Sequence, residues 1–146
     1  MSVRMVLDTT VLVAALRSAA GASRQLLVAA LEKKFELLLS VPLMIEYESV
    51  LTRKEHLKAA GLKEAEVKEL LDALAAVAEP VVPSFRWRPM LRDPNDDMVF
   101  EAALNGQADL LVTFNKRDFE QAALRNLRIA SPGEALRELR KSYEKK

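Results

Sequence analysis

The sequence predicts an α/β fold of three layers, with a central parallel sheet of four or five strands covered by helices on both faces. Two patterns predict it. Short apolar runs rich in Val and Leu alternate with longer segments whose apolar residues recur at helical spacing. Strands and helices that alternate in this way build parallel sheets buried on both faces. We expect a single domain over residues 1–146, because a chain of this length can bury a hydrophobic core without disulfides or structural metals.

The first half of the chain contains two of the predicted strands. An apolar run from Val3 ends at Asp8 and leads directly into a helical pattern, as the first strand of such a sheet would. Pro42 suits the first turn of a later helix, and His56 falls in a charged turn that we place at the surface. The expected elements are a strand from residue 3 to Asp8, helices to about 17 and over 21–34, a strand over 35–40, and helices over 43–53 and 63–78.

The second half supplies the remaining strands. Val81 and Val82, between two prolines, predict a short third strand. The following segment, 84–92, carries Phe85 and Trp87 among three arginines. Such aromatic residues stack on bases, cover the edge of the core or form a dimer contact. The expected elements after it are a helix over 93–105, a strand over 110–113, a helix from 118, a strand over 127–130 and a helix from 132.

Composition excludes several kinds of chemistry. The chain has no cysteine and one histidine, so thiolate zinc sites and cysteine nucleophiles are excluded and multi-histidine metal sites are not possible. The net charge of +1 shows that the chain as a whole is not strongly basic, as many nucleic-acid-binding proteins are, although local basic patches remain possible. No export signal or membrane-spanning run is visible, and we expect a cytoplasmic protein.

Asp8 stands where ligands usually bind in open α/β sheets, just outside the carboxyl end of a strand. The alternative is that Asp8 only caps the helix that follows it. Acidic residues elsewhere, in places where folding alone does not require them, would favour the functional interpretation.

Two further acids meet that criterion. Glu46 lies within the apolar stripe of its helix, where an unpaired carboxylate is costly, unless it occupies a partly exposed edge beside a cation. Asp96 lies on the buried side of the helix that begins at Asp93-Pro94. Capping explains Asp93 well and the orientation of Asp96 less well.

Gathered in one cleft, these three carboxylates would repel one another by roughly 3 kcal/mol per pair at about 5 Å. They would therefore need a cation. Oxygen ligands without histidine or cysteine favour Mg²⁺ or Mn²⁺, which activate water and stabilise phosphoryl oxygens. Phosphodiester hydrolysis is the leading prediction.

Four blocks of the sequence, taken in order, resemble the PIN domain family, and in particular the prokaryotic PIN proteins described as toxins of VapBC-like toxin–antitoxin pairs. The blocks are residues 6–16, 40–51, 92–104 and 108–119. The resemblance implies a PIN-like fold with a helical clip over 43–78 used for dimerisation, and a Mg²⁺- or Mn²⁺-dependent endoribonuclease that cleaves single-stranded RNA. It also implies a small antitoxin protein as partner and a homodimer or higher homo-oligomer.

The resemblance assigns the metal to Asp8, Glu46 and Asp96. Where the family commonly has a fourth acid this chain has Asn115, which can coordinate through its carbonyl. Asp118 is the other auxiliary candidate, although an acid at such a position is more often a plain helix N-cap. The family also often has Asn at the position of Thr10.

Four residues are candidate contacts to the RNA backbone: Thr113, Lys116, Arg117 and Arg53. The alternative for each is that it is an ordinary solvent-exposed side chain. Two other functions remain open. One is a weakened PIN-like module that binds RNA or a partner protein without cutting. The other is phosphoryl transfer through an aspartyl phosphate, which would need an acid where Thr10 stands.

Overall fold

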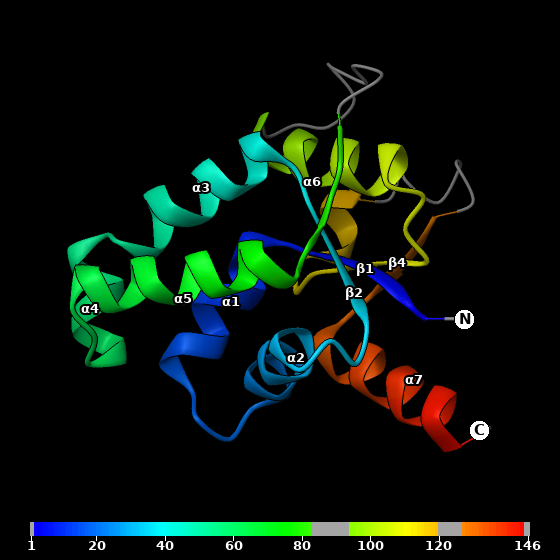
Figure 1. Cartoon of the computed structure of the whole chain (residues 1–146), viewed down its shortest axis with the longest axis horizontal. Coiled ribbons are helices and arrows are strands. Elements are labelled where there is room, and N and C mark those ends of the chain that lie inside the picture. The colour runs from blue at the N-terminus through cyan, green and yellow to red at the C-terminus, as the bar shows by residue number, and fades with distance from the viewer. Residues whose placement is uncertain (1, 83–93, 120–126, 145–146) are drawn as a thin grey trace.

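The structure is a computed structural model that describes residues 2–82, 94–119 and 127–144, and the side chains of these residues other than 94–97 and 144. Its centre is a parallel sheet of five strands in the order β3-β2-β1-β4-β5 (Figure 1). The strands are β1 (Arg4–Leu7), β2 (Glu36–Leu39), β3 (Glu79–Pro80), β4 (Leu110–Val112) and β5 (Arg128–Ala130). The predicted three-layer α/β/α fold is confirmed, with five strands in the sheet.

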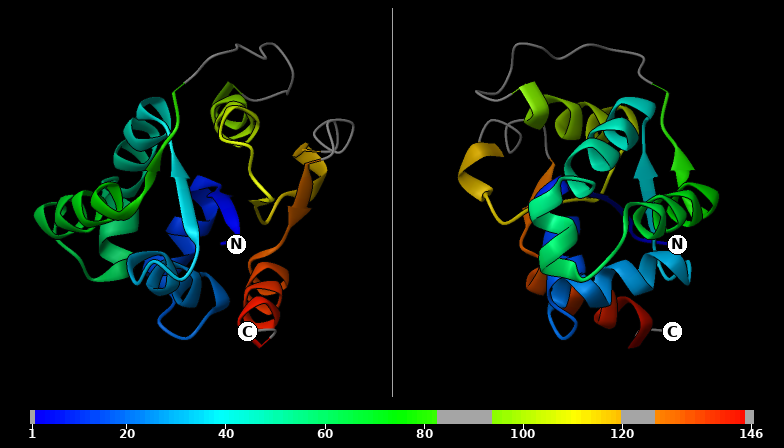
Figure 2. Two further views of the ribbon diagram at one scale, coloured as in Figure 1. Left: turned by 45° about the vertical axis from the view of Figure 1, so that its right-hand side comes forward. Right: turned by 90° about the vertical axis from the view of Figure 1, so that its left-hand side faces the viewer.

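Helices cover the sheet on both sides. Helix α6 contacts β1, β2 and β4, whereas α7 contacts β4, β5 and α2. Figures 1 and 2 show α6 on one side of β1, with α2 and α7 on the other. The described helices are α1 (Thr9–Arg17), α2 (Ala22–Leu31), α3 (Val41–Leu51), α4 (Lys54–Ala60), α5 (Glu64–Val77), α6 (Pro94–Asn105) and α7 (Pro132–Glu144).

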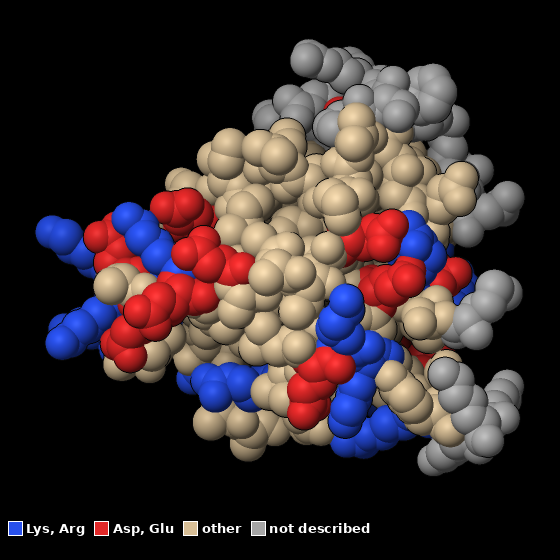
Figure 3. All heavy atoms as spheres, in the orientation of Figure 1, with Lys and Arg blue, Asp and Glu red and all other residues tan. Residues whose placement is uncertain are grey.

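Helices α3, α4 and α5 project together beyond the sheet, as the expected helical clip does (Figure 1). Acidic and basic side chains crowd this end of the molecule (Figure 3). Lys68 lies 4.0 Å from both Glu48 and Glu64, so part of this charge is paired between neighbouring helices. Exposed pairs of this kind contribute little to stability, typically less than about 1 kcal/mol.

The third strand lies two residues earlier than the sequence predicted. Glu79 and Pro80 pair with Leu38 and Leu39 of β2, and Val81 only donates its backbone N–H to Leu39 at 3.0 Å. Helix α5 ends at Val77, so the chain reaches the sheet edge almost at once, before the apolar pair. Val82 is consequently 75% exposed.

Two polar segments also differ from the prediction. Residues 54–60 form helix α4, and His56 lies on it with a side chain only 17% exposed, so its placement in a charged surface turn was wrong. Asp118 lies inside a 3₁₀ turn over residues 116–119 and not at the first residue of a helix, and its N–H bonds to the Asn115 carbonyl at 3.0 Å. The remainder of that expected helix, like Phe85 and Trp87, lies outside the described residues.

No single described helix is long and apolar enough to span a membrane. Helices α1 and α2 reach the required length and hydropathy only when taken together, and they are bent by 103° at the break between them.

Candidate active site

The strand order places the topological switch point of the sheet at the carboxyl ends of β1 and β4, and we refer to the region just outside these two strand ends as the crevice. From β1 the chain moves outward through β2 to β3, then crosses back to β4 on the other side of β1. Connections therefore diverge between β1 and β4, and ligands of open α/β sheets bind at such a switch point. Asp8 directly follows β1, and Thr113 directly follows β4.

Asp8 is held between these two strand ends and the first turn of α1. Its backbone N–H bonds to the Val112 carbonyl at 2.9 Å, and its side chain is almost fully buried. The hydroxyls of Thr113 and Thr10 donate to the same carboxylate oxygen, Oδ2, at 2.7 and 2.9 Å. The other oxygen, Oδ1, receives neither hydroxyl. Thr10 thus supports Asp8 directly, at the position where the resemblance leads us to expect Asn.

Burial raises the pKa of Asp8 above its ordinary value, and the hydrogen bonds from Thr113 and Thr10 and from the adjacent backbone oppose this rise. The environment therefore disfavours the charged carboxylate while providing donors that fix its orientation. A cation held by this carboxylate would relieve the desolvation cost. The site is suited to a metal in this respect, because Asp8 is a buried, oriented oxygen ligand.

Glu46 lies on α3, which begins at the end of β2. Ser40 caps the helix at the end of β2, accepting a hydrogen bond from Leu43 N–H at 3.2 Å. The buried face carries Leu43, Tyr47 and Leu51, while Glu46 is half-buried beside it. Helix α3 contacts α1, which follows Asp8, and α6, which carries Asp96.

Asp96 lies in the first turn of α6, and its side chain is outside those described. Its helix contacts both β1 and β4, which end at the crevice. Among the side chains that the structure describes, no three acidic or histidine groups are close enough together to hold a metal ion. Convergence of Asp8, Glu46 and Asp96 therefore stays a prediction.

The segment after β4 forms an exposed rim. Asn115 donates its backbone N–H to the Thr113 hydroxyl at 3.0 Å, and its side chain is exposed, as are those of Arg117 and Asp118. Lys116 forms an ion pair with Glu134 in the first turn of α7. Phe114 is 54% exposed, an unusual state for a large aromatic residue beside a buried strand end.

Arg53 lies apart from the other predicted RNA contacts. It precedes α4, two residues beyond the end of α3. Because α3 begins at the carboxyl end of β2 and its 11 residues span roughly 16 Å, Arg53 is distant from the crevice along that helix.

Sequence reasoning treated one residue of this site only as core. The hydroxyl of Tyr47, which is fully buried, donates a hydrogen bond to the carbonyl of Leu7, the residue before Asp8. Its position next to Glu46 was visible, but an aromatic residue in an apolar stripe gives no signal of what its hydroxyl reaches.

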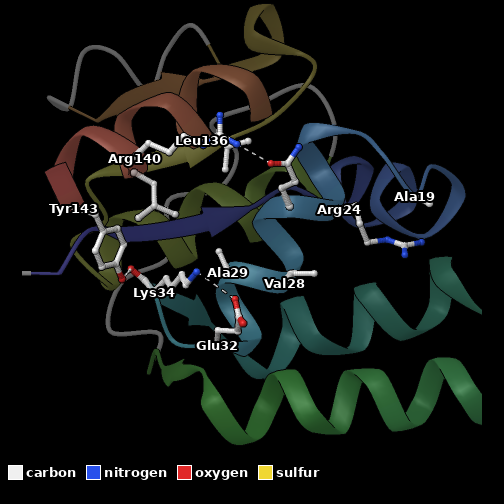
Figure 4. Close-up of a pocket in the computed structure, with 11 residues that line it drawn as sticks. Ala19, Arg24, Val28, Ala29, Glu32, Lys34, Leu136, Arg140 and Tyr143 are labelled. Carbon is white, nitrogen blue, oxygen red and sulfur yellow. Dashed lines mark hydrogen bonds and ion pairs between the residues drawn. The ribbon is translucent and has the colours of Figure 1, made fainter.

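A groove of about 640 Å³ lies between α2 and α7, and Figure 4 shows the side chains that line it. Polar side chains that line the groove interact with one another: Arg140 donates a hydrogen bond to Gln25 at 2.8 Å, and Lys34 lies 3.5 Å from Glu32. None of the predicted site residues lines this groove. It is separate from the crevice at Asp8.

Fold and site together define an α/β/α protein with a buried, hydroxyl-supported carboxylate at the switch point of a parallel sheet. The model of the PIN domain family matches residues 4–117, and the chain belongs to this family. The fold is similar to that in the crystal structure of VapBC2 from Rickettsia felis bound to a DNA fragment from their promoter, with a TM-score of 0.60 and 18% identity. That match covers 88% of this chain and 98% of the other. No curated protein matches the chain significantly.

Proposed function

We propose that this protein is a Mg²⁺- or Mn²⁺-dependent endoribonuclease that cleaves single-stranded RNA. The observation that carries the proposal is Asp8, a buried carboxylate oriented by two hydroxyls at the switch point of a PIN domain. Keeping an acid in this environment costs stability, and nothing in the packing of the strand requires it.

In this proposal Asp8, Glu46 and Asp96 hold the metal, with Asn115 or Asp118 as an auxiliary ligand. When bound, the metal supplies an activated water and neutralises charge on the phosphoryl oxygens. The protein contributes the orientation of Asp8 through Thr113 and Thr10 and the placement of Glu46 through α3. Lys116 and Arg117 at the rim hold the RNA backbone, and Arg53 does so only where the RNA extends along α3. Thr113 was predicted as a further RNA contact, but it is fully buried and its hydroxyl is bonded to Asp8 and Asn115, so its role is to orient Asp8.

The biological role that we propose is the toxin of a toxin–antitoxin pair, acting in the cytoplasm. Two comparisons support it: membership in the PIN family and the fold shared with a VapBC2 complex. A small antitoxin would then cover the crevice, and the projecting helices α3 to α5 would form the contact of a homodimer.

The test is RNA cleavage by the purified wild-type protein with Mn²⁺, compared with Asp8→Asn prepared identically. We expect cleavage that requires Mn²⁺ and is abolished by Asp8→Asn, whereas Asp72→Asn on the exposed face of α5 cleaves normally. Cleavage that survives Asp8→Asn would contradict the proposed role and point to a contaminating nuclease.

A module that binds RNA or a partner without cutting is the second candidate, favoured by Asn115 at the family's fourth acidic position. Thermal unfolding with increasing Mn²⁺ separates the two. A working site gains about 2.7 kcal/mol when Mn²⁺ is 100 times its Kd. A module that has lost its metal shows no dependence on Mn²⁺ and no cleavage.

A further inference from the structure

One hydrogen bond joins the backbone neighbours of two predicted metal ligands. Tyr47 follows Glu46 on α3, and Leu7 precedes Asp8 at the end of β1. The hydroxyl of Tyr47 donates to the carbonyl of Leu7, with both residues fully buried. The bond therefore connects α3 to β1 within one residue of each acid.

The Tyr47 hydroxyl acts as a hydrogen-bond donor. Burial raises the pKa of Tyr47 far above its ordinary value, and the negative charge of Asp8 raises it further. A backbone carbonyl has no proton to donate, so the phenol is the donor in its bond to Leu7.

The attachment limits how α3 moves relative to the sheet. Its first turn is fixed by the Ser40 cap at the end of β2, and Tyr47 fixes it again about two turns later. Two fixed points on a helix determine both its distance from the sheet and its rotation about its own axis. Rotation decides whether Glu46 faces the crevice or the solvent.

We propose that Tyr47 is a positioning residue that sets the separation of the Asp8 and Glu46 carboxylates for metal binding. This inference rests on the proposed nuclease function. It assigns Tyr47 no contact with metal or RNA; its hydroxyl acts through the backbone of Leu7. The alternative is a hydroxyl that only satisfies a buried carbonyl and contributes to stability.

The chain offers a matched control. It contains two tyrosines, and the hydroxyl of Tyr143 also donates to a backbone carbonyl, that of Lys34, at 2.6 Å. Tyr143 lies in α7 beside the groove at α2, away from Asp8. Tyr47→Phe and Tyr143→Phe thus delete the same group and the same kind of bond, one near the crevice and one remote from it.

The experiment measures three quantities in the wild type and both variants: the unfolding midpoint without metal, the Mn²⁺ concentration giving half of the maximal stabilisation, and kcat and KM for RNA cleavage. We expect both variants to be folded. Tyr47→Phe alone should need at least about tenfold more Mn²⁺ and lose up to about 100-fold in kcat, since small misplacements of catalytic groups have effects of this size. KM for RNA should change little.

Equal Mn²⁺ midpoints and equal kcat values for the two variants would overturn the positioning role. So would the loss of native near-ultraviolet circular dichroism in Tyr47→Phe, because the hydroxyl would then be needed for the fold itself. A third variant with 4-aminophenylalanine at position 47 restores a donor and should restore the Mn²⁺ midpoint. A wild type that neither binds Mn²⁺ nor cleaves RNA would refute the proposed function itself, and this is known before any variant is compared.

Discussion

The hydroxyl of Thr113 lies between two partners at the switch point: it donates to Oδ2 of Asp8 at 2.7 Å and accepts from the N–H of Asn115 at 3.0 Å. A hydroxyl has one proton, so the bond accepted from Asn115 leaves that proton directed at the carboxylate. The end of β4 therefore orients the acid at the end of β1. The arrangement links the rim segment to the predicted metal ligand through a single oxygen atom.

Replacing Thr113 with Val should lower the free energy of unfolding by about 1–3 kcal/mol, because the buried Asp8 loses a donor and the Asn115 N–H loses its acceptor. Thr113→Ser keeps the hydroxyl and removes one methyl group, with an expected cost of about 1 kcal/mol. Urea unfolding of both variants without metal measures the difference. Equal losses for Val and Ser would mean that packing, and not the hydroxyl, matters at this position.

Asp8→Asn should stabilise the metal-free protein near neutral pH. Burial raises the pKa of Asp8, so the native state binds this proton more tightly than the unfolded chain does. Stability then falls as pH rises from the ordinary pKa of the carboxyl, and the loss is complete above the raised pKa. Asn removes the charge and still accepts from both threonines.

Thermal unfolding at pH 7 with a metal chelator checks this prediction, and Asp72→Asn on exposed α5 controls for the loss of one negative charge. Added Mn²⁺ should reverse the order, because only the wild type keeps the ligand. A metal-free Asp8→Asn protein less stable than the wild type would show that the carboxylate is stabilising without a cation.

The parallel sheet could be predicted from the sequence because β1, β2 and β4 are short apolar runs, and the start of α3 could be anticipated from Pro42. The place of Asp8 at a carboxyl edge followed from the same pattern. The third strand was misplaced because β-branched Val81 and Val82 looked more strand-like than Glu79 and Pro80, whereas the end of α5 decided the register. No local pattern reveals that Tyr47 reaches Leu7, 40 residues away in the chain. Long-range hydrogen bonds of this kind become visible only when the fold is known.

The ion pair between Lys116 and Glu134 should make the free energy of unfolding depend on pH in the acidic range. Lys116, aided by Ser131, lowers the pKa of Glu134 from 4.5 to about 2. A depressed carboxyl pKa adds stability that is fully present above about pH 4.5 and is lost as pH falls toward 2. Glu134→Gln should therefore be less stable than the wild type at pH 6, and the difference should vanish near pH 2.

Because both side chains are nearly half exposed, solvent screening limits the effect to less than about 1 kcal/mol. Urea unfolding at several pH values measures it. The side-chain amide in the Glu134→Gln variant still offers an oxygen to the Ser131 backbone N–H, so the comparison isolates the charge. A difference independent of pH would mean that the carboxylate contributes only as a helix cap.

Phe114 should contribute to RNA binding by stacking on a base. It is 54% exposed, next to Thr113 and followed by Asn115 and two basic residues at the rim of the crevice. Exposed aromatic residues beside cations bind single strands without a strong sequence preference, and each stacked base contributes roughly 1–3 kcal/mol. In the Asp8→Asn background, which prevents cleavage, Phe114→Ala should weaken binding of single-stranded RNA while Phe114→Tyr retains it. Fluorescence anisotropy measures both, with the exposed Val82→Ala as a control for lost apolar surface. Unchanged affinity in Phe114→Ala would leave this aromatic residue free for a contact with another protein.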